Sequence, residues 1–352
     1  MKKLSLQHKN FLIKKSRAAL NGKRIVVQLD KKIALVFESN KYPYRIVNRL
    51  LWINAPENLD LSEPNFNSTV SFFKSIRSLS RLVFNRVYID FTTIKQLSPL
   101  AALLLTSEIH QWQINKGRLR VKDHEEWSPN VKRLLHEMGF FDLVNISNRP
   151  DLEYPTPLSI KFSPFKCGHK TLGDQAVSLR QEMEKIAGVI PAKTLMYGGL
   201  TEAMKNVLNW AYDENTPESL RLWWMAGSYN PNDERMTIMI YDHGVGIPKT
   251  LPRSTFWEHV KPLITGEDDH DMIEAAMKIG RSATKESNRG KGLADIKKFV
   301  MESGSGILRI ISGKGEYTVT NTGVEKKILH ESRLDGTLIA WEIRGKKEDL
   351  ND

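Results

Sequence analysis

Short apolar strands alternate with amphipathic helices over residues 44–146, and this alternation restricts the fold more than any other feature of the sequence. The predicted elements are strands over 44–54, 86–91 and 117–123, and helices over 66–83, 98–117 and 128–140. Ser128 and Pro129 are typical of a helix start, and Gly117 and Gly139 of helix ends. Strands separated by helices require crossover connections, so we expect an α/β fold with a sheet covered by helices.

A second region of α/β character follows a linker over 149–158 that is rich in proline and polar residues. Its predicted elements are strands over 159–165, 235–241 and 335–343, and helices over 173–188, 199–212, 272–279 and 293–300. With 352 residues and 40% hydrophobic content, the chain is long enough for two domains. Alternating apolar residues over 23–37 predict a short hairpin ahead of them. We expect a basic arm with this hairpin over 1–43 and domains over 44–148 and 159–348.

Cysteine content and hydropathy indicate where in the cell the chain is found. Cys167 is the single cysteine, which excludes an internal disulfide. No apolar run approaches the roughly 18 residues that a membrane span requires. The N-terminal sequence also lacks the apolar stretch and cleavage site of a signal peptide. We therefore expect a cytoplasmic protein with no membrane span.

The net charge of +11 is unevenly distributed, because no acidic residue precedes Asp30. The basic residues ahead of Asp30 are Lys2, Lys3, Lys9, Lys14, Lys15, Arg17, Lys23 and Arg24. Such an arm binds nucleic acid, an acidic membrane surface or an acidic protein, or it only keeps the terminus solvated. No helix-turn-helix, zinc-finger spacing or aromatic RNA-binding signature accompanies it, so no motif supports nucleic acid as a partner.

Four short segments of the second region carry the residues suited to chemistry. Glu202 and Asn206 stand four residues apart and so project from one face of the helix predicted over 199–212. Taken singly, each segment also fits a solvated helix face or a tight turn. A glycine loop that opens a helix, as one of the segments does, suits phosphate binding. The other segments contain Asp242, Gly244 and Gly246 after a strand, Gly290, Lys291, Gly292 and Leu293 before a helix, and Gly336 and Thr337 at a strand start.

The first region resembles the STAS domain of anti-sigma-factor antagonists. The match lies in RVYIDFTTIKQLSPLAALLL, GRLRV and SPNVKRLLHEMGFFDLV. It implies a docking or regulatory module for a protein partner, or a structural partner of the second domain. Antagonists usually carry a phosphorylatable Ser or Thr just before the helix, whereas Pro99 and Leu100 stand there in this sequence and Ser98 is displaced. A phosphorylation switch at Ser98 is therefore not implied.

The four segments of the second region, in their order over 159–344, resemble the GHKL nucleotide-binding fold shared by gyrase, mismatch-repair ATPases, histidine kinases and anti-sigma serine kinases. The anti-sigma kinases have the same Glu-Ala opening, the same Asn four residues after Glu, and a Tyr at the position of Tyr212. The resemblance implies an α/β sandwich with helices packed on one face of a mixed sheet. The cofactors it implies are ATP and Mg²⁺.

The resemblance also implies a role for each residue. Glu202 becomes the general base, and Asn206 holds Mg²⁺ through its amide oxygen; a carboxylate and a neutral amide oxygen suit those roles. Asp242 accepts a hydrogen bond from the adenine amino group, and Thr337 assists through water. The residues that let the backbone approach the base or cradle the phosphates are Gly244, Gly246, Gly290, Lys291, Gly292 and Leu293.

A lid is expected between Pro248 and Arg289. Its acidic cluster could suggest a second metal site, but acidic residues in the first turn of a helix complement the helix dipole, which is the interpretation we favour. The cluster comprises Glu267, Asp268, Asp269, His270 and Asp271. Lys285 and Arg289 are further candidates for contacting the triphosphate.

Two differences from the GHKL family restrict the activities that the resemblance implies. We expect no transducer domain after the last segment, which excludes a DNA-strand-passage machine. An upstream STAS-like domain in place of a phosphoacceptor hairpin disfavours a histidine kinase, and His110 and His136 are simply surface or core residues. The leading hypothesis is an ATP-hydrolysing switch that regulates a partner; a serine/threonine kinase of the anti-sigma type and a non-catalytic nucleotide-gated binding protein remain alternatives. The oligomeric state is open, with a homodimer as one option.

Overall fold

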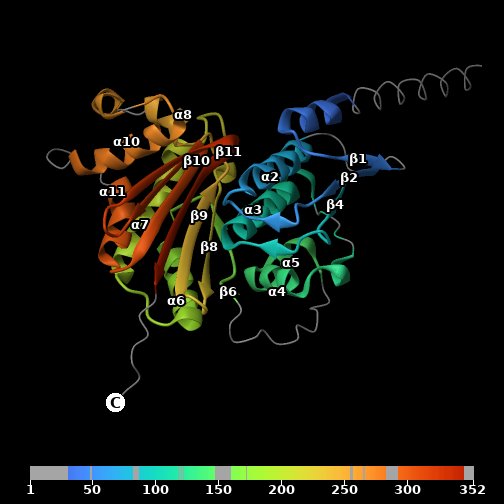
Figure 1. Ribbon diagram of the computed structural model, residues 1–352, viewed down its shortest axis with the longest axis horizontal. Helices are drawn as coiled ribbons and strands as arrows, with labels where there is room; N and C mark the ends of the chain where they lie inside the picture. The colour runs from blue at the N-terminus through green and yellow to red at the C-terminus, as the bar shows by residue number, and fades with distance from the viewer. Residues whose placement is uncertain are drawn as a thin grey trace, which may run out of the picture.

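Two α/β halves lie side by side in the computed structural model of the chain (Figure 1). The structure describes residues 31–47, 50–81, 87–117, 119, 121, 123–146, 160–171, 173–253, 257–264, 266–282 and 292–344. The basic arm and the linker over 149–158 lie outside these residues, so the expectations for them are not tested here.

The N-terminal half contains a small mixed sheet in the order β1-β2-β4, in which β1 and β2 are antiparallel and β2 and β4 parallel. A second, two-stranded parallel sheet joins β3 and β5. A helical segment over 31–40 precedes them. The elements are β1 (Arg45–Val47), β2 (Leu50–Asn54), β3 (Asn58–Leu59), α2 (Phe66–Ser80), β4 (Val87–Asp90), β5 (Gln96–Leu97), α3 (Pro99–Lys116), η1 (His124–Glu126), α4 (Pro129–Met138) and α5 (Phe140–Val144).

Local sequence signals set the ends of these helices. The Ser98 hydroxyl accepts a hydrogen bond from the Ala101 amide at 3.4 Å, and Pro99 occupies the first turn of α3. Gly117 ends α3 with a φ of 78°, and Gly139 ends α4 with a φ of 87°, a backbone region that glycine enters without a steric penalty. The predicted helix boundaries at these positions are confirmed.

The hairpin expected over 23–37 is wrong for the residues that the structure describes, because residues 31–40 form a helix. Ile33 and Phe37 lie one helical turn apart, and both are buried in the core. Apolar residues at that spacing satisfy a helical period as well as an alternating one, so the short run was ambiguous. The strand expected over 44–54 becomes two strands, β1 and β2. Of the strand expected over 117–123, residues 118, 120 and 122 lie outside the described residues, and the described residues 117, 119, 121 and 123 are not in a strand.

The C-terminal half is built on a six-stranded sheet with the path β10-β11-β9-β8-β6, and β7 also pairs with β8. The strands are β6 (Lys161–Phe162), β7 (Lys166–Gly168), β8 (Trp223–Asn230), β9 (Arg235–Asp242), β10 (Gly306–Thr320) and β11 (Glu325–Arg344). The helices and helical turns are α6 (Gly173–Ala187), α7 (Lys193–Asn206), η2 (Val207–Ala211), η3 (Glu218–Leu220), α8 (Ile247–Thr250), η4 (Leu251–Arg253), α9 (Trp257–Val260), η5 (Lys261–Leu263), α10 (Asp269–Ser282) and α11 (Gly292–Glu302).

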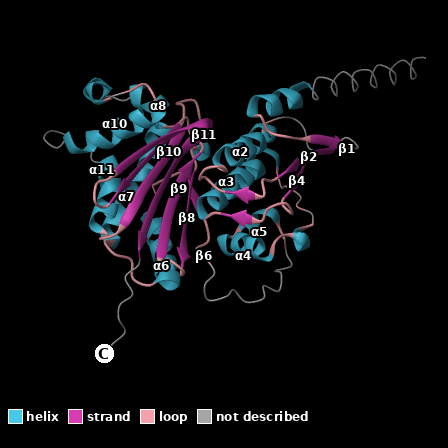
Figure 2. Cartoon of the chain, viewed as in Figure 1, coloured by secondary structure: helices cyan, strands magenta, loops and turns pink. Residues whose placement is uncertain are grey.

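This sheet differs from the expected one in two respects. Among the described residues, each of its strand pairings is antiparallel, whereas a mixed sheet was expected. The helices of the C-terminal half lie on one face of the sheet, as expected, but the second face is also covered, by helices of the N-terminal half (Figure 2). Helices α6, α7, α10 and α11 lie on one side, and α2 and α3 of the N-terminal half on the other. The α/β class is confirmed; the arrangement within it is different from the expectation.

Alternating residues of β8, β9 and β11 supply two separate cores. Trp224, Tyr241 and Ala340 belong to the core that also contains the apolar residues of α2 and α3. Their neighbours in sequence, such as Trp223 and Trp341, belong to the core formed with α7 and α11. Because successive residues of a strand point to opposite faces, a strand buried on both sides reads as a nearly continuous apolar run. The two halves therefore share one hydrophobic core across the first of these faces.

A buried ion pair lies in the seam between the halves. Arg77 of α2 and Glu108 of α3 form it, with side chains 6% and 1% exposed. The Arg77 guanidinium also donates to the Tyr241 hydroxyl of β9 at 2.8 Å, and that hydroxyl donates to the Asp335 carbonyl of β11 at 2.7 Å. The N-terminal half is thus bonded to two inner strands of the sheet, β9 and β11. Burial raises the pKa of Glu108 even though Arg77 opposes this shift.

We expect Arg77→Met to destabilise the protein by about 3–5 kcal/mol, because it leaves Glu108 buried without its partner. The double variant Arg77→Met, Glu108→Leu should be markedly more stable than the sum of the two single changes predicts. Chemical denaturation of the three variants measures both effects. As a control, Lys95→Met breaks the exposed pair with Glu57, whose side chains are 69% and 63% exposed, and should cost less than about 1 kcal/mol. Additive single effects would contradict the assigned pairing.

Candidate functional site

Asp242 is the last residue of β9, and its carboxylate is buried, with the residue only 4% exposed. The Gly244 amide donates a hydrogen bond to Asp242 Oδ1 at 2.7 Å. In the sheet, Asp242 pairs with Thr337 of β11 on one side and with Trp223 of β8 on the other. A buried carboxylate is held at a strand end by backbone amides, which leaves acceptor capacity for a ligand.

Burial raises the pKa of Asp242 from 3.8 to about 7, and the Gly244 amide and Arg77 offset only part of the shift. The carboxylate therefore changes charge near neutral pH. Buried groups with such shifted pKa values cluster at functional sites. The end of β9 is therefore the leading candidate for a functional site.

The glycines around Asp242 are required by the packing of the protein itself. A Cβ at Gly244 would overlap the Ala211 carbonyl, and a Cβ at Gly336 would overlap the Asp242 carbonyl. Gly246 and Gly336 have φ values of 89° and 86°, in the left-handed region. The sequence suggested that these glycines let the backbone approach a base; the structure gives them a role in bringing three chain segments together around Asp242.

Gly336 and Thr337 were expected at the start of a strand, but they lie inside the long strand β11. Opposite them, Ser312 of β10 is fully buried and joins three segments of the site. Its hydroxyl oxygen accepts from the Ile247 amide at 2.9 Å and lies 3.0 Å from the Gly336 carbonyl and 3.1 Å from Thr337 Oγ1. Sequence reasoning missed Ser312, because a single serine in an apolar strand carries no motif.

Glu202 and Asn206 lie in the last turns of α7, which begins at Lys193, earlier than predicted. After Asn206 the helix widens into the π-helical turn η2, a distortion that is frequent at functional sites. The Ala211 carbonyl at its end accepts a hydrogen bond from the Val245 amide at 2.7 Å. The end of η2, which continues α7, is therefore bonded to the loop that follows Asp242, which brings two of the four predicted segments together.

The Glu202 side chain is 23% exposed, and its Oε2 lies 3.8 Å from Lys205 Nζ. Asn206 is half-buried. Glu202 and Asn206 place a carboxylate and an amide on one helix face, oxygen ligands of the kind that Mg²⁺ accepts, and the Lys205 ammonium near Glu202 would have to move away from the carboxylate for a cation to bind.

The third predicted segment is only partly described. Gly290 and Lys291 lie outside the described residues, as do Lys285 and Arg289. Gly292 is the first residue of α11, one residue earlier than predicted, and Leu293 is the next. The inner face of α11 is confirmed at Ile296, Phe299 and Val300, which are buried. Helix α11 packs against α7, so the N-terminal end of α11 belongs to the same side of the sheet as Glu202.

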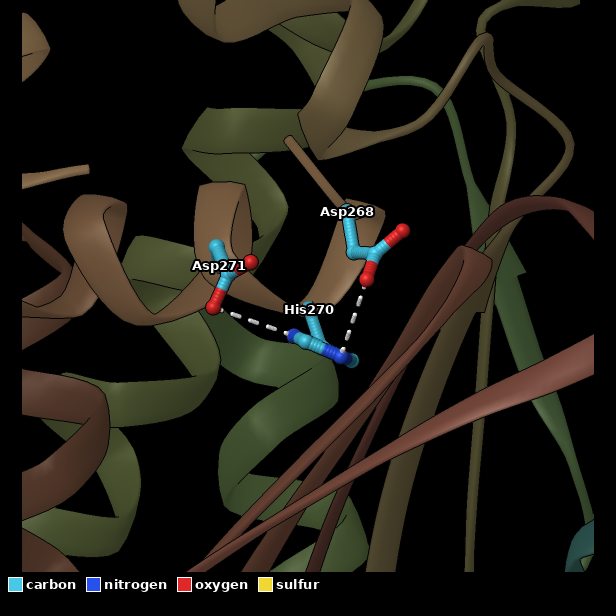
Figure 3. Close-up of side chains that lie close together, drawn as sticks. All are labelled: Asp268, His270 and Asp271. Carbon is cyan, nitrogen blue, oxygen red and sulfur yellow. Dashed lines mark ion pairs between the residues drawn. The ribbon is translucent and has the colours of Figure 1, made fainter. Parts of the chain in front are cut away.

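The acidic cluster lies at the start of α10 (Figure 3). His270 Nδ1 is 3.2 Å from Asp271 Oδ1, and its Nε2 is 3.8 Å from Asp268 Oδ2. The Lys327 ammonium contacts the same Asp271 oxygen at 2.8 Å. Although burial opposes it, the hydrogen bond from Lys327 lowers the pKa of Asp271. A lysine at this carboxylate competes with a cation, in agreement with a structural role for the cluster.

In comparisons with known proteins, no protein-family model matches the chain, and no curated protein matches its sequence. Within the described parts of the chain, no helix combines the length and apolar character needed to cross a membrane.

The shifted pKa of Asp242 predicts a pH-dependent stability. The folded protein has the higher pKa, about 7 against 3.8, so this group contributes stability that is complete below about pH 4 and is lost as the pH rises through about 7. Asp242→Asn should therefore gain stability over the wild type as the pH rises, with the gain levelling off above pH 7. Thermal unfolding between pH 4 and pH 8.5 measures it. Asp213→Asn, at an exposed carboxylate, serves as control; an equal trend in both variants would contradict the assignment.

Gly336→Ala should destabilise more than Gly304→Ala, although both glycines have positive φ values. At Gly304 nothing lies within 4 Å of the added methyl group, so only backbone strain of about 1–2 kcal/mol is expected. At Gly336 the methyl group also meets the Asp242 backbone, which adds about 1–3 kcal/mol. Denaturant unfolding of the two variants gives the comparison. Equal losses would show that close packing around Asp242 is not required.

Proposed function

We propose that the chain is an ATP-binding protein whose C-terminal half acts as a GHKL-type nucleotide domain and whose N-terminal half acts as a STAS-like regulatory module. It hydrolyses ATP with Mg²⁺ and uses the nucleotide as a switch that regulates a protein partner. The observation that carries this proposal is the buried Asp242 carboxylate at the end of β9, held by the Gly244 amide and paired in the sheet with Thr337.

Asp242 suits recognition of an amino group on a planar base. A carboxylate is an acceptor when ionised, and the exocyclic amino group of adenine is a donor. The hydrogen bond forms in a buried setting, where charge-assisted bonds are strong. Thr337 lies beside Asp242 in the sheet and can hold a water molecule that reaches the same base.

Glu202 and Asn206 supply the chemistry in this proposal. The Asn206 amide oxygen would hold Mg²⁺, which when bound neutralises charge on the phosphates. Glu202 orients a water molecule and accepts its proton as that water attacks the terminal phosphate. The hydrogen bond between Ala211 and Val245 fixes α7 relative to the adenine-binding loop, so the two groups keep a constant relation to the base.

The position of Ser98 favours a switch over a kinase that modifies its own N-terminal half. Ser98 caps α3, and α3 packs on the sheet face opposite the one that carries α7 and Glu202. A phosphoryl group beside Glu202 is therefore separated from Ser98 of the same chain by the six-stranded sheet. Regulation of a separate protein through the N-terminal half fits this arrangement better.

Purified protein incubated with γ-labelled ATP and Mg²⁺ tests the proposal. Label should appear as free phosphate, and none should remain on the protein. Stable label on the chain would instead favour the kinase. An absence of both nucleotide binding and turnover would contradict the proposed function.

Two variants separate binding from chemistry. Glu202→Ala should retain nucleotide affinity and lose roughly 10² to 10⁴ in turnover, because a general base acts in the transition state and does not hold the ground state. Asn206→Ala should lose the Mg²⁺-dependent part of the affinity. Calorimetry with and without Mg²⁺, together with phosphate release, gives both quantities. Wild-type turnover in both variants would assign the activity to another site.

A further inference from the structure

Strand β11 departs from regular pairing in its middle. Leu329 pairs with Gly315 of β10, and Leu334 pairs with Gly313, so residues 330–333 lie opposite Lys314 alone. We call residues 330–333 the β11 bulge. Extra residues of this kind bend a strand and redirect its side chains, and they are frequent beside functional sites. The bulge ends close to Thr337, the partner of Asp242.

One side of the β11 bulge is bonded to the start of α2 in the N-terminal half. The His330 ring is fully buried and stacks on Phe66 with centroids 3.5 Å apart. His330 Nδ1 is 3.2 Å from Glu63 Oε1. The Ser332 amide donates to the Asn67 side-chain oxygen at 2.9 Å. The N-terminal half thus holds the bulge through both a side chain and the backbone.

The other side of the β11 bulge is bonded to α10, which lies within the expected lid. Arg333 Nη1 is 3.3 Å from Asp269 Oδ2, and the same oxygen accepts from the Lys314 amide at 2.7 Å. Asp269 is the first residue of α10. Side chains at Gly313 and Gly315 would overlap Asp269 and His270, so α10 lies directly against β10 here. The start of α10 is held jointly by the bulge and by the residue opposite it.

We infer that the β11 bulge couples the docking of α10 to the contact between the N-terminal half and the sheet. Ser332 and Arg333 are adjacent, and they are bonded to α2 and to α10 respectively, so a change in the bulge that releases one contact displaces the other. The inference rests on the proposed function in one respect: α10 belongs to the lid of the nucleotide site. A partner that shifts α2 then alters nucleotide affinity, and nucleotide alters partner affinity by the same factor.

Hydrogen exchange of the full-length chain without nucleotide tests the coupling. Asn67→Ala, a change in α2, removes the acceptor of the Ser332 amide. It should accelerate exchange of the α10 amides over 273–277 by at least about fivefold, the lower end of ordinary coupling between sites. Asn67→Asp keeps an acceptor oxygen and should leave these rates unchanged. Ser68→Ala, whose hydroxyl bonds only locally to the Asn65 carbonyl, is a second control.

The reciprocal variant is Asp269→Ala, which frees the start of α10 and should accelerate exchange of the Ser332 amide. If Asn67→Ala does not fold, the Asp269→Ala variant alone tests whether the two contacts are coupled. Faster exchange at Ser332 in Asn67→Ala with unchanged rates in α10 would overturn the inference, as would an unchanged Ser332 amide in Asp269→Ala. No nucleotide is present in these experiments, so a failed ATP titration contradicts the proposed function and leaves the coupling result intact.

Discussion

Burial of both faces of the six-stranded sheet is the constraint on which the rest of the structure depends. The inner strands β8 and β9 carry apolar residues in both orientations, and neither face can be left in water without exposing tryptophan, methionine and isoleucine side chains. The C-terminal half covers one face with its own helices, and α2 and α3 cover the other. The N-terminal half is therefore part of the core of the protein as well as a candidate regulatory module.

Because both faces of the sheet are buried, polar side chains in it destabilise the folded protein unless they form hydrogen bonds or ion pairs. Arg77, Glu108 and Tyr241 satisfy one another in the seam, whereas Asp242, the next residue along β9, accepts hydrogen bonds from backbone amides. A carboxylate with a pKa near 7 is a source of instability that a ligand with a donor group relieves. The same strand thus carries a satisfied network on one face and, at its end, a buried carboxylate that titrates near neutral pH.

Much of this could be predicted from the sequence, because long periodic segments such as α2, α6 and α11 reveal their buried faces directly. The segments with Glu202 and Asp242 were also identifiable, and the structure brings them together through η2. The hairpin prediction was wrong over 31–37, the part of it that the structure describes, because Ile33 and Phe37 fit two periodicities. Ser312 and the β11 bulge could not be predicted, since both depend on which residues the strands bring opposite one another, and strand register is not visible in a single sequence.

The central claim is that Asp242 reads the amino group of adenine in a nucleotide. Calorimetric titration of the wild-type protein with ATP and with inosine triphosphate, both with Mg²⁺, tests it most directly, because the two differ in having an amino or a carbonyl group at one ring position. At pH 8.5, where Asp242 is ionised because its pKa is about 7, we expect measurable ATP binding and at least about tenfold weaker binding of inosine triphosphate, since a carbonyl oxygen would then face the Asp242 carboxylate in place of the amino group. Equal affinity for the two nucleotides, or no binding of ATP, would contradict it.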